Sequence, residues 1–431
     1  MSEARAIAPS PPAGWAEVPL GRAADVVFSN VDKKAWPSEP LVKLCNYVDV
    51  YQHDYLGADH PYMTATASHA EVAKFGLRPG DVVITKDSET PDDIGVPTIV
   101  DAVDGVVVCG YHLALIRPRD GNNPIFLAKQ LGQQRLRSYF AKEANGLTRY
   151  GLSNASVKGA PLWLPPIKEQ ERIATVLRAV DDAIHQGAMV LAKHTLVRQA
   201  LLQALTSSGV DEHGEARDPV THPELFESSK VGLIPRAWRV VEVQDVFSRR
   251  VERGLRGLPV MAVTKDRGLI PREEVERRVE SALTPEEHSL VRDGDIVYNM
   301  MRMWQGVLGR AERDCLVSPA YVVMKPKSGC DSRFAAYLFS SPMAVSRFRR
   351  WSQGIVDDRL RLYFHDLAKI EFAVPRSTEE QMHVASTLQA ADELVAGAAA
   401  RINVLRDLRR GLTDDLVSGS VRLVVPCGAC Q

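Results

Sequence analysis

Side chains that could do chemistry gather in three places in this sequence. Carboxylates crowd the segment 88–93, three histidines share one loop-rich region, and two cysteines lie near the end of the chain: Glu89, Asp92, Asp93; His53, His60, His69; Cys427, Cys430. Such groups can hold zinc or a hydrolytic metal ion, provided that their spacing fits a coordination shell. The carboxylates lack a following lysine at nuclease-like spacing, the histidines fit no common zinc pattern, and the cysteines lack a second ligand pair. We therefore expect no metal site, and an inert C-terminal tail.

Other catalytic signatures are also missing from the sequence. There is no Gly-x-x-x-x-Gly-Lys-Ser/Thr loop for a nucleotide phosphate, and no Gly-x-Gly-x-x-Gly that would open a helix behind a strand. There is no Gly-x-Ser-x-Gly nucleophile elbow and no His-Glu-x-x-His zinc helix. The sequence therefore predicts no catalytic residue and no cofactor held by this chain.

The composition limits the classes of protein to which this chain can belong. The chain has 431 residues, 45% hydrophobic and 25% charged, which predicts two to four globular units. No apolar run approaches the roughly 18 residues of a membrane span, and the six cysteines form no disulfide framework. We expect a cytoplasmic protein with a disordered leader at 1–14. The net charge of −1 leaves room for a basic face beside an acidic connector.

The elements that would position any site occur twice in the sequence. Leu164-Pro-Pro-Ile-Lys-Glu-Gln170 starts a periodic run that ends near 208, and Val374-Pro-Arg-Ser-Thr-Glu-Glu-Gln381 starts another that ends near 419. The two glutamines lie 211 positions apart, and the same offset maps the apolar residues Ile173, Leu177, Val180, Ile184, Leu191, Leu201 and Leu205 onto Val384, Leu388, Ala391, Val395, Ile402, Leu412 and Leu416. Arg198, which is off the apolar pattern, maps onto Arg409. The sequence therefore predicts two halves, each ending in a long helix.

The apolar residues of both runs advance in steps of three and four, the spacing of a coiled coil. A helix over 169–205 would extend about 55 Å, longer than one small domain can cover. We therefore predict that the two helices pair antiparallel. The alternative is that each helix packs separately against its own domain.

Each half repeats the same series of shorter elements before its long helix. Trp15 and Trp238 are each followed by a short apolar element at the start of a half. In the first half we then expect a strand at 41–50, a Gly-Asp turn at 80–81 that enters a strand, a further strand at 106–116, a helix at 125–141, a glycine turn at Gly146 and a last strand at 160–164. In the second half we expect the same elements in the same order: a strand at 258–263, a Gly-Asp turn at 294–295 that enters a strand, a further strand at 318–324, a helix at 332–351, a glycine turn at Gly354 and a last strand at 370–374. The fold class is α+β, as a duplicated mixed domain.

This duplicated order resembles the specificity subunit of type I restriction–modification systems. The resemblance covers residues 15–423, and its carriers are the two proline-to-glutamine helix starts, Gly232-Leu-Ile-Pro-Arg-Ala-Trp238 and the two Gly-Asp turns. One departure is that Pro375 stands one residue further from its glutamine than Pro165 does, which predicts a looser start for the second helix.

The resemblance implies a non-catalytic DNA-binding subunit that reads a bipartite, asymmetric double-stranded target. It implies a target-recognition domain at 15–166, a spacer helix at 167–208, a linker at 209–231, a second target-recognition domain at 232–376, a second spacer helix at 377–420 and a tail at 421–431. The expected partners are two methyltransferase subunits and restriction–translocase subunits, which would carry S-adenosylmethionine, ATP and magnesium. No membrane partner is expected.

Candidate DNA readers under this resemblance are polar and aromatic residues at strand ends and glycine turns: Lys86, Ser88, Tyr111, His112, Thr148, Arg149, Tyr150, Asn299, Arg302, Trp304, Gln305, Tyr321, Gln353, Arg359 and Arg361. For 299–306 the alternative is a methionine-rich core turn. Candidate docking and spacer residues on the helices are Glu169, Gln170, Ile173, Leu177, Ile184, Leu191, Gln381, Val384, Leu388, Val395, Ile402 and Leu412.

Two other functions remain open at this point. One is a coiled-coil adaptor that binds proteins and not DNA. The other is an enzyme fragment with its own methyl-transfer activity.

Overall fold

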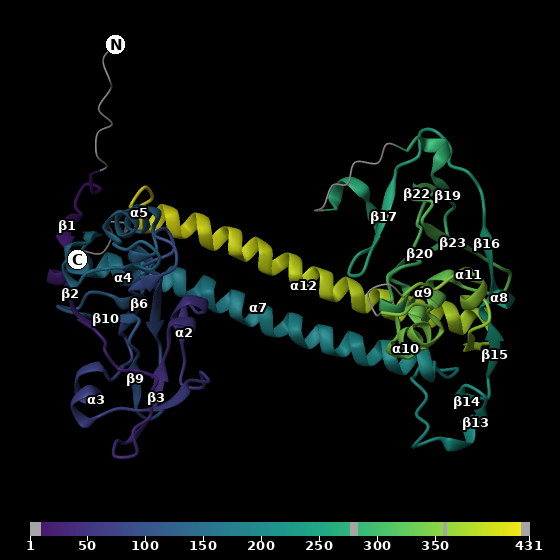
Figure 1. Ribbon diagram of the computed structural model, residues 1–431, viewed down its shortest axis with the longest axis horizontal. Helices are drawn as coiled ribbons and strands as arrows, with labels where there is room; N and C mark the ends of the chain where they lie inside the picture. The colour runs from purple at the N-terminus through teal and green to yellow at the C-terminus, as the bar shows by residue number, and fades with distance from the viewer. Residues whose placement is uncertain (1–9, 276–282, 357–359, 424–431) are drawn as a thin grey trace, which may run out of the picture. The chain divides into compact units, whose positions relative to one another are not determined.

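The computed structural model describes residues 10–275, 283–356 and 360–423, in two compact units. The first unit contains residues up to Gly187 together with those from Arg401 onward, and the second contains Ala188–Ala400 (Figure 1). The long helices α7 (Ile167–Ser207) and α12 (Thr378–Ser418) have 41 residues each and contribute to both units. Cys427, Cys430 and the first nine residues of the expected leader lie outside the described residues, but Pro12 already accepts a hydrogen bond from the Trp15 backbone.

The strands of the first unit form a five-stranded sheet in the order β2-β10-β6-β8-β4, a three-stranded sheet β5-β3-β9 and two short pairs, β1-β12 and β11-β7. Their bounds are β1 Ala16–Pro19, β2 Ala24–Phe28, β3 Leu41–Cys45, β4 Tyr55–Leu56, β5 Met63–Thr66, β6 Val82–Thr85, β7 Asp87–Ser88, β8 Pro97–Val100, β9 Val107–Cys109, β10 Leu113–Pro118, β11 Tyr150–Gly151 and β12 Pro161–Leu164. The short helices are α1 Leu20–Ala23, α2 Tyr47–Gln52, α3 His69–Phe75, α4 Pro124–Leu131, α5 Gln134–Glu143 and α6 Asn154–Gly159.

The second unit has a four-stranded sheet β16-β23-β20-β21 and the pairs β15-β24, β19-β22, β17-β18 and β13-β14. Its strands are β13 Phe226–Ser229, β14 Gly232–Pro235, β15 Trp238–Glu242, β16 Phe247–Arg250, β17 Met261–Thr264, β18 Gly268–Pro271, β19 Ser289–Val291, β20 Ile296–Asn299, β21 Leu308–Arg310, β22 Cys315–Val317, β23 Tyr321–Pro326 and β24 Glu371–Pro375. Its helices are η1 Pro223–Leu225, α8 Val243–Val246, η2 Arg272–Glu274, η3 Pro285–Glu287, η4 Met303–Gln305, α9 Ser332–Ser340, α10 Pro342–Trp351 and α11 Phe364–Leu367.

The two units repeat one topology. The order β2-β10-β6-β8 in the first corresponds to β16-β23-β20-β21 in the second. In each unit the strand at the opening tryptophan pairs antiparallel with the strand before the long helix, as β1 with β12 and β15 with β24. This pairing brings the tryptophan that opens each half next to the start of its long helix, since Trp238 lies opposite Pro375. The predicted α+β fold with an internal repeat is confirmed.

Four predicted elements are wrong in detail. The strand at 41–50 ends at Cys45, because the Asp49 carboxylate accepts a hydrogen bond from the Asn46 backbone and starts α2 there. The strand at 106–116 is two strands, β9 and β10, which lie in different sheets. The helix at 125–141 breaks at Gly132, and the helix at 332–351 breaks before Pro342, whose ring nitrogen has no hydrogen to donate.

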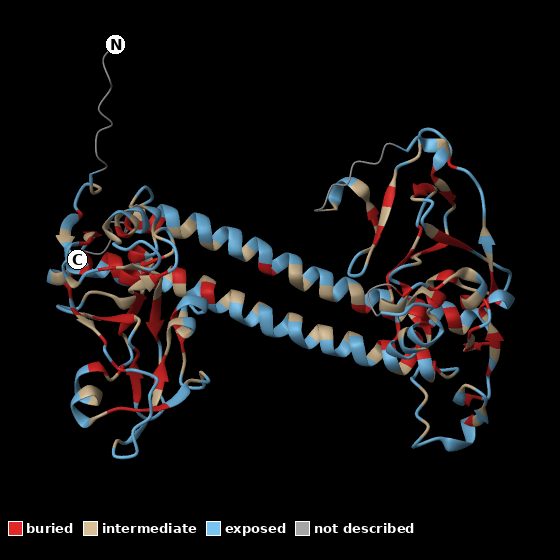
Figure 2. Ribbon diagram, viewed as in Figure 1, coloured by how far each residue is buried: buried red, intermediate tan, exposed pale blue. Residues whose placement is uncertain are grey.

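Each unit holds its own hydrophobic core (Figure 2). One large cluster of the second unit surrounds Trp238 and contains Phe334, Phe339, Phe348 and Phe372, whose side chains are essentially buried. It also includes Leu205 of α7 and Val384 of α12, so the end of one long helix packs beside the start of the other. In the first unit Leu177 of α7 and Leu416 of α12 share a cluster in the same way, which makes the two helices antiparallel within each unit.

Candidate nucleic-acid interface

The repeated glutamine explains how each long helix is attached to its domain. Gln170 is 1% exposed, and its Oε1 accepts a hydrogen bond from the Asn123 backbone at 3.0 Å while its Nε2 donates to Pro165 O. In the second half, Gln381 Oε1 accepts a hydrogen bond from the Asp331 backbone at 2.8 Å, and Gln381 Nε2 donates to Pro375 O at 3.0 Å. Asn123 and Asp331 are the N-caps of α4 and α9. One amide side chain therefore joins the last strand, the shorter helix and the long helix in each half.

This arrangement also decides how the second helix starts. Both long helices begin three residues before their glutamine, at Ile167 and Thr378. The extra residue of the second start therefore lies in the turn before the helix, where the Ser377 hydroxyl accepts a hydrogen bond from the Glu379 backbone. The prediction of a looser second start is wrong, since Gln381 is as closely held as Gln170.

The glutamate before each glutamine forms a second repeated contact. The Glu169 carboxylate accepts two hydrogen bonds from Arg422, at 2.6 and 2.7 Å. Glu380 accepts hydrogen bonds from Arg217 and from the Trp238 indole nitrogen, the latter at 2.9 Å. In both cases the arginine follows the C-terminal end of the other long helix, so the contact fixes that end beside the helix start.

A third repeated contact lies further along the helices. Arg198 Nε is 2.7 Å from the Asp392 carboxylate, to which the Tyr337 hydroxyl also donates at 2.8 Å. In the first unit, Arg409 lies 3.5 Å from Asp181, which accepts a hydrogen bond from a tyrosine hydroxyl and pairs with Lys129 at 2.9 Å. The off-pattern arginines that repeat in the sequence therefore each lie within ion-pair distance of an equivalent aspartate on the opposite helix, although Arg409 donates its hydrogen bond to Asp54, at 2.6 Å.

Eight of the docking and spacer candidates are buried within the chain: Glu169, Gln170, Ile173, Leu177, Gln381, Val384, Leu388 and Ile402. The middle of each long helix is more open (Figure 2). Large apolar side chains exposed there include Met189 at 62%, Leu196 at 66% and Val404 at 68%. Of the predicted docking residues, Ile184, Leu191, Val395 and Leu412 are partly exposed, so a surface for a partner would combine these four with exposed residues outside the predicted set.

The structure brings the seven candidate readers of the first half into one patch. Lys86 Nζ lies 4.6 Å from the centre of the Tyr111 ring, and the Lys86 backbone nitrogen bonds to His112 O. Ser88 of β7 is paired with Tyr150 of β11, and the exposed Thr148 and Arg149 stand on the turn immediately before β11. Residues separated by up to 64 positions in the sequence thus face one surface region.

Not every member of this patch is free to contact a ligand. Ser88 is 8% exposed and the Lys86 side chain 11%, whereas Tyr111 is 51% exposed. Asp87 orients the patch, because its Oδ2 lies 3.2 Å from Lys86 Nζ and 2.8 Å from His112 Nδ1. Sequence reasoning missed Asp87, although its position between two candidates on a short strand was a usable signal.

Two stacked tyrosines extend the first patch. The rings of Tyr47 and Tyr51 lie 5.5 Å apart, and the Tyr51 hydroxyl donates to Asp93. Burial raises the pKa of Tyr47, as do the neighbouring carboxylates, while a hydrogen bond with Ser88 opposes them. Neither tyrosine stands out in the sequence, since Tyr47 lies in the segment 41–50 that is predicted as a strand and Tyr51 follows it directly.

In the second half the candidates form a group around the end of β20. Asn299 is paired with Tyr321 of β23, and Arg302, Trp304 and Gln305 follow in the turn and helix η4. Met303 is fully buried while Arg302 is exposed, so 299–306 combines a buried methionine with an exposed arginine. The guanidinium of Arg349 lies 5.7 Å from the centre of the Trp304 ring, which adds a second cation to the group.

The glycine turn of the second half adjoins this group. Gln353 and Arg361 form an antiparallel bridge with backbone hydrogen bonds of 2.8 and 2.9 Å, and Leu362 N bonds to Met300 O. Arg359 lies outside the described residues. Within the described part of the chain, Arg302 and Arg361 are exposed and make no ion pair, whereas the Gln353 side chain donates to Asp366.

The carboxylates of the two Gly-Asp turns are structural. Asp81 is 2% exposed and accepts two hydrogen bonds from Arg117, both at 2.7 Å. Asp295 is 1% exposed and is held in the same way by Arg250, from a different strand. A buried carboxylate that is fully paired stabilises its turn and offers no free oxygen to a metal ion.

No group of three or more metal-ligating side chains occurs among the described residues, and no helix there is long and apolar enough to cross a membrane. The described cysteines, Cys45, Cys109, Cys315 and Cys330, are free thiols. Burial raises the pKa of Cys330 to about 12, so its thiol stays protonated and unreactive.

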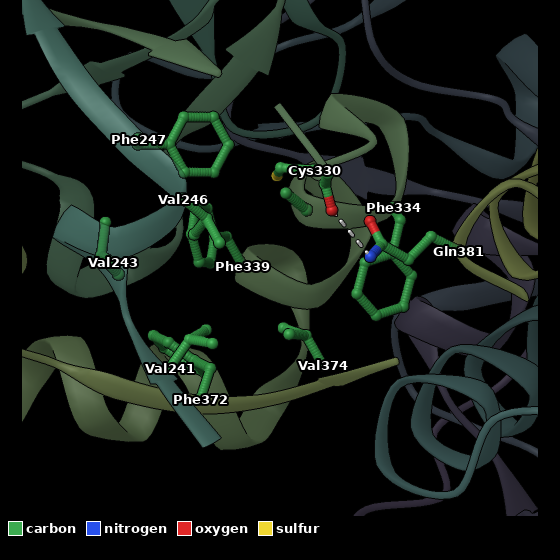
Figure 3. Close-up of a pocket in the computed structure, with 12 residues that line it drawn as sticks. Val241, Val243, Val246, Phe247, Cys330, Phe334, Phe339, Phe372, Val374 and Gln381 are labelled. Atoms are coloured by element: carbon green, nitrogen blue, oxygen red, sulfur yellow. Dashed lines mark hydrogen bonds between the residues drawn. The ribbon is translucent and has the colours of Figure 1, made fainter. Parts of the chain in front are cut away.

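A small cavity lies in the core of the second unit (Figure 3). Its volume is about 20 Å³, room for roughly one water molecule. Its walls are valine and phenylalanine side chains, with Gln381 at one edge, where the amide donates to Gly329 O. A cavity of this size and lining is a packing defect, and it cannot hold a nucleoside-sized cofactor.

The fold and its two surface groups define a duplicated protein with a different polar and aromatic patch in each half. The solved structures that it resembles include a type I restriction–modification S subunit from M. genitalium, with a TM-score of 0.56, 14% identity and coverage of 93% of this chain and 96% of that chain. Another comes from work on assembly and conformational transition of the type I restriction–modification system, with a TM-score of 0.52, 17% identity and coverage of 96% and 100%.

The sequence relatives carry the same description. The putative type I restriction enzyme MjaX specificity subunit of Methanocaldococcus jannaschii is 22% identical over 368 residues, which are 82% of this chain and 81% of that protein. The MjaVIII specificity subunit of the same organism is 23% identical over 279 residues, 60% of this chain and 62% of that protein. No family model matches the chain. The predicted resemblance to type I specificity subunits is confirmed.

Proposed function

We propose that this chain is the sequence-specific DNA-binding subunit of a type I restriction–modification complex and has no catalytic role itself. The observation that carries the proposal is the duplicated joint at Gln170 and Gln381, which attaches one domain to each long helix. The relatives named above support it. Each half would read one part of a bipartite double-stranded target, from a recognition domain at 15–166 or 232–376.

The two patches support an asymmetric target because they offer different chemistry. The first combines Lys86, Tyr111 and His112 with the carboxylate of Asp87. The second presents the exposed guanidinium groups of Arg302 and Arg361. Arginine suits guanine in the major groove, whereas a carboxylate accepts a hydrogen bond from cytosine N4, so the two halves would prefer different bases.

The helices at 167–208 and 377–420 would act as spacers, with 209–231 as a linker. Geometry fixes half-site spacing in DNA-binding proteins that read two sites at once. The three repeated contacts at Glu169 and Glu380, Gln170 and Gln381, and Arg198 and Arg409 support a defined register between the helices.

The proposed partners are two methyltransferase subunits and restriction–translocase subunits. S-adenosylmethionine, ATP and magnesium would be bound by these partners, in the cytoplasm. The exposed apolar residues in the middle of the helices, such as Met189 and Leu196, support docking of a protein there.

Methylome sequencing of a host that carries the full system tests the proposal. We expect a split, asymmetric methylated motif that disappears when this chain is deleted. Salt-dependent binding of the assembled complex to a duplex with that motif would then exclude a protein-only adaptor. Methyl transfer from labelled S-adenosylmethionine by this chain alone would contradict the non-catalytic role, and an unchanged methylome in the deletion strain would contradict the proposal as a whole.

A further inference from the structure

The two most exposed large apolar side chains of the described residues occupy the same position in the two halves. Leu147 is 97% exposed and Ile355 is 102% exposed, and the next in rank, Val220, is 85% exposed. Each follows a glycine, Gly146 or Gly354, at the tip of the glycine turn. A single exposed leucine is ordinary on a protein surface, but the same exposure at the same place in both halves is not.

The backbone holds these side chains outward. Gly146 has a φ of +150° and Gly354 has a φ of +157°. A Cβ at Gly146 would lie 2.0 Å from Arg149 O, so only glycine fits there. The base of the first turn is closed by two backbone hydrogen bonds between Asn145 and Gly151, at 3.0 and 2.9 Å, and the second by the bridge between Gln353 and Arg361.

Each turn is fastened to the patch of its own half. In the first unit Leu152, directly after the turn, donates its backbone N–H to Lys86 O at 2.8 Å, and Tyr150 is paired with Ser88. In the second unit Arg361 belongs to the bridge that closes the turn, and Leu362 bonds to the segment that carries Arg302. The apolar tips therefore stand next to the polar residues proposed to read DNA.

We propose that Leu147 and Ile355 are wedges that insert between stacked bases at the edge of each half-site. This inference rests on the proposed DNA-binding function. Proteins that bend duplex DNA use leucine or isoleucine side chains to open a base step, and the cost of unstacking falls at flexible pyrimidine–purine steps. The wedge would give each half a preference at a base step that makes no hydrogen bond with the protein.

The surroundings favour DNA over a protein as the occupant. The residues next to Leu147 in the turn are Asn145, Thr148 and Arg149, all exposed and polar. A protein interface needs a contiguous apolar centre, whereas a wedge needs one apolar side chain within groups that bind phosphate and base edges. Ile355 is followed by the half-exposed Val356, and the exposed Arg361 belongs to the bridge that closes its turn.

The test uses the full chain in complex with its methyltransferase subunits and a duplex that carries the methylated motif. 2-Aminopurine is placed in turn at each step of both half-sites, because its fluorescence rises when it is unstacked. Leu147→Ala and Ile355→Ala are compared with Val220→Ala, which removes a similarly exposed apolar side chain from the connector. Because all three side chains are at least 85% exposed, their removal takes no contact from the core, and the three variants should fold alike.

The wild-type complex should raise the fluorescence at one step in each half-site. Leu147→Ala should abolish the rise in one half-site only, Ile355→Ala in the other, and each should weaken binding about tenfold, while Val220→Ala changes neither. Specific binding without any rise in fluorescence would overturn the wedge and leave the proposed function standing. Failure of the wild-type complex to bind the duplex would overturn both. Loss of methyltransferase assembly in either tip variant would identify the tips as protein contacts and also overturn the wedge.

Discussion

Arg198 and Asp392 form an ion pair between the two long helices, with Arg198 Nε 2.7 Å from a carboxylate oxygen. A shift of 211 positions turns this pair into Arg409 and Asp181, which lie 3.5 Å apart in the first unit. In an antiparallel pair of equivalent helices, a contact between two positions can recur between the two equivalent positions, as it does for this arginine and aspartate. The duplication that is visible in the sequence is therefore also a symmetry of contacts.

The Arg198–Asp392 pair predicts a coupling energy. Asp392→Ala should lower the free energy of unfolding of the second unit by about 1 kcal/mol, because the pair is partly exposed and the Tyr337 hydroxyl also loses its acceptor. A double-mutant cycle with Arg198→Ala, followed by urea denaturation, measures the coupling. Asp414→Ala, at an exposed carboxylate of α12, serves as the control and should be nearly neutral. A coupling of zero would show that the pair does not hold the helices together.

The glutamine joint predicts a larger effect. Gln381→Leu keeps the side chain's volume but removes the acceptor for Asp331 N and the donor to Pro375 O, in a site that is 2% exposed. Loss of both should cost about 2 kcal/mol of unfolding free energy. Gln389→Leu, on an exposed face of the same helix, is the matched control and should change stability by less than about 0.5 kcal/mol. Equal effects of the two substitutions would contradict the role of the joint.

Asp331 predicts a dependence of stability on pH. Burial pushes the pKa of this carboxyl up, but hydrogen bonds from Arg333 and from the Phe334 backbone outweigh it and leave the pKa below its usual value. Because the folded pKa is depressed, the stabilisation is present above about pH 4 and is lost as the pH falls through the folded pKa.

Asp331→Asn should remove this contribution to acid sensitivity while keeping the helix cap, since Asn123 caps α4 in the first half. Urea denaturation at a series of pH values between about 2 and 6 measures the effect. If the variant lost stability in acid as steeply as the wild type, the titration of Asp331 would play no part.

Replacement of Arg302 should reduce the affinity for DNA without reducing assembly with the methyltransferase subunits. Its guanidinium is exposed at the end of β20 and makes no ion pair within the described part of the chain. Arg302→Ala should weaken binding of the methyltransferase complex to its target about tenfold, the effect of one arginine–base contact. Arg313→Ala removes another exposed arginine of the same unit and should change affinity much less. Unchanged affinity of the Arg302 variant in a gel-shift assay would exclude this residue as a reader.

Tyr111 gives the corresponding prediction for the first half. The Tyr111 side chain is half-exposed, and the centre of its ring lies 4.6 Å from Lys86 Nζ. Tyr111→Ala should weaken binding about tenfold and should relax the methylated motif in one half-site only. Trp36→Ala, at an exposed aromatic residue elsewhere in the same unit, is the control. Relaxation of both half-sites, or of neither, would contradict a local role for Tyr111.

Local patterns predicted much of the fold. The two helix starts, the Gly-Asp turns and the last strands agree with the structure because periodicity, prolines and glycines act on neighbouring residues. The apolar pattern at 41–50 predicts one strand because a buried strand and a buried helix are equally apolar, whereas in the structure the Asn46–Asp49 capping contact separates β3 from α2. Pro342 was a visible signal for the break between α9 and α10.

The candidate site was predicted only in part. Strand ends and glycine turns selected Tyr111 and Arg302, which the structure finds exposed, but they could not show that Ser88 is buried against β11. Tyr47 and Tyr51 were missed because they join the first patch through folding, from a helix far from Tyr111 in the sequence.

The sequence by itself determined the duplication, the helix starts and the fold class, because each of these follows from the order and spacing of residues along the chain. Only the tertiary structure decided what the repeated residues do. Gln170 meets Asn123 across 47 positions and Arg422 meets Glu169 across 253. Such contacts depend on which strands pair and on the direction in which the long helices run, and no local pattern carries that information.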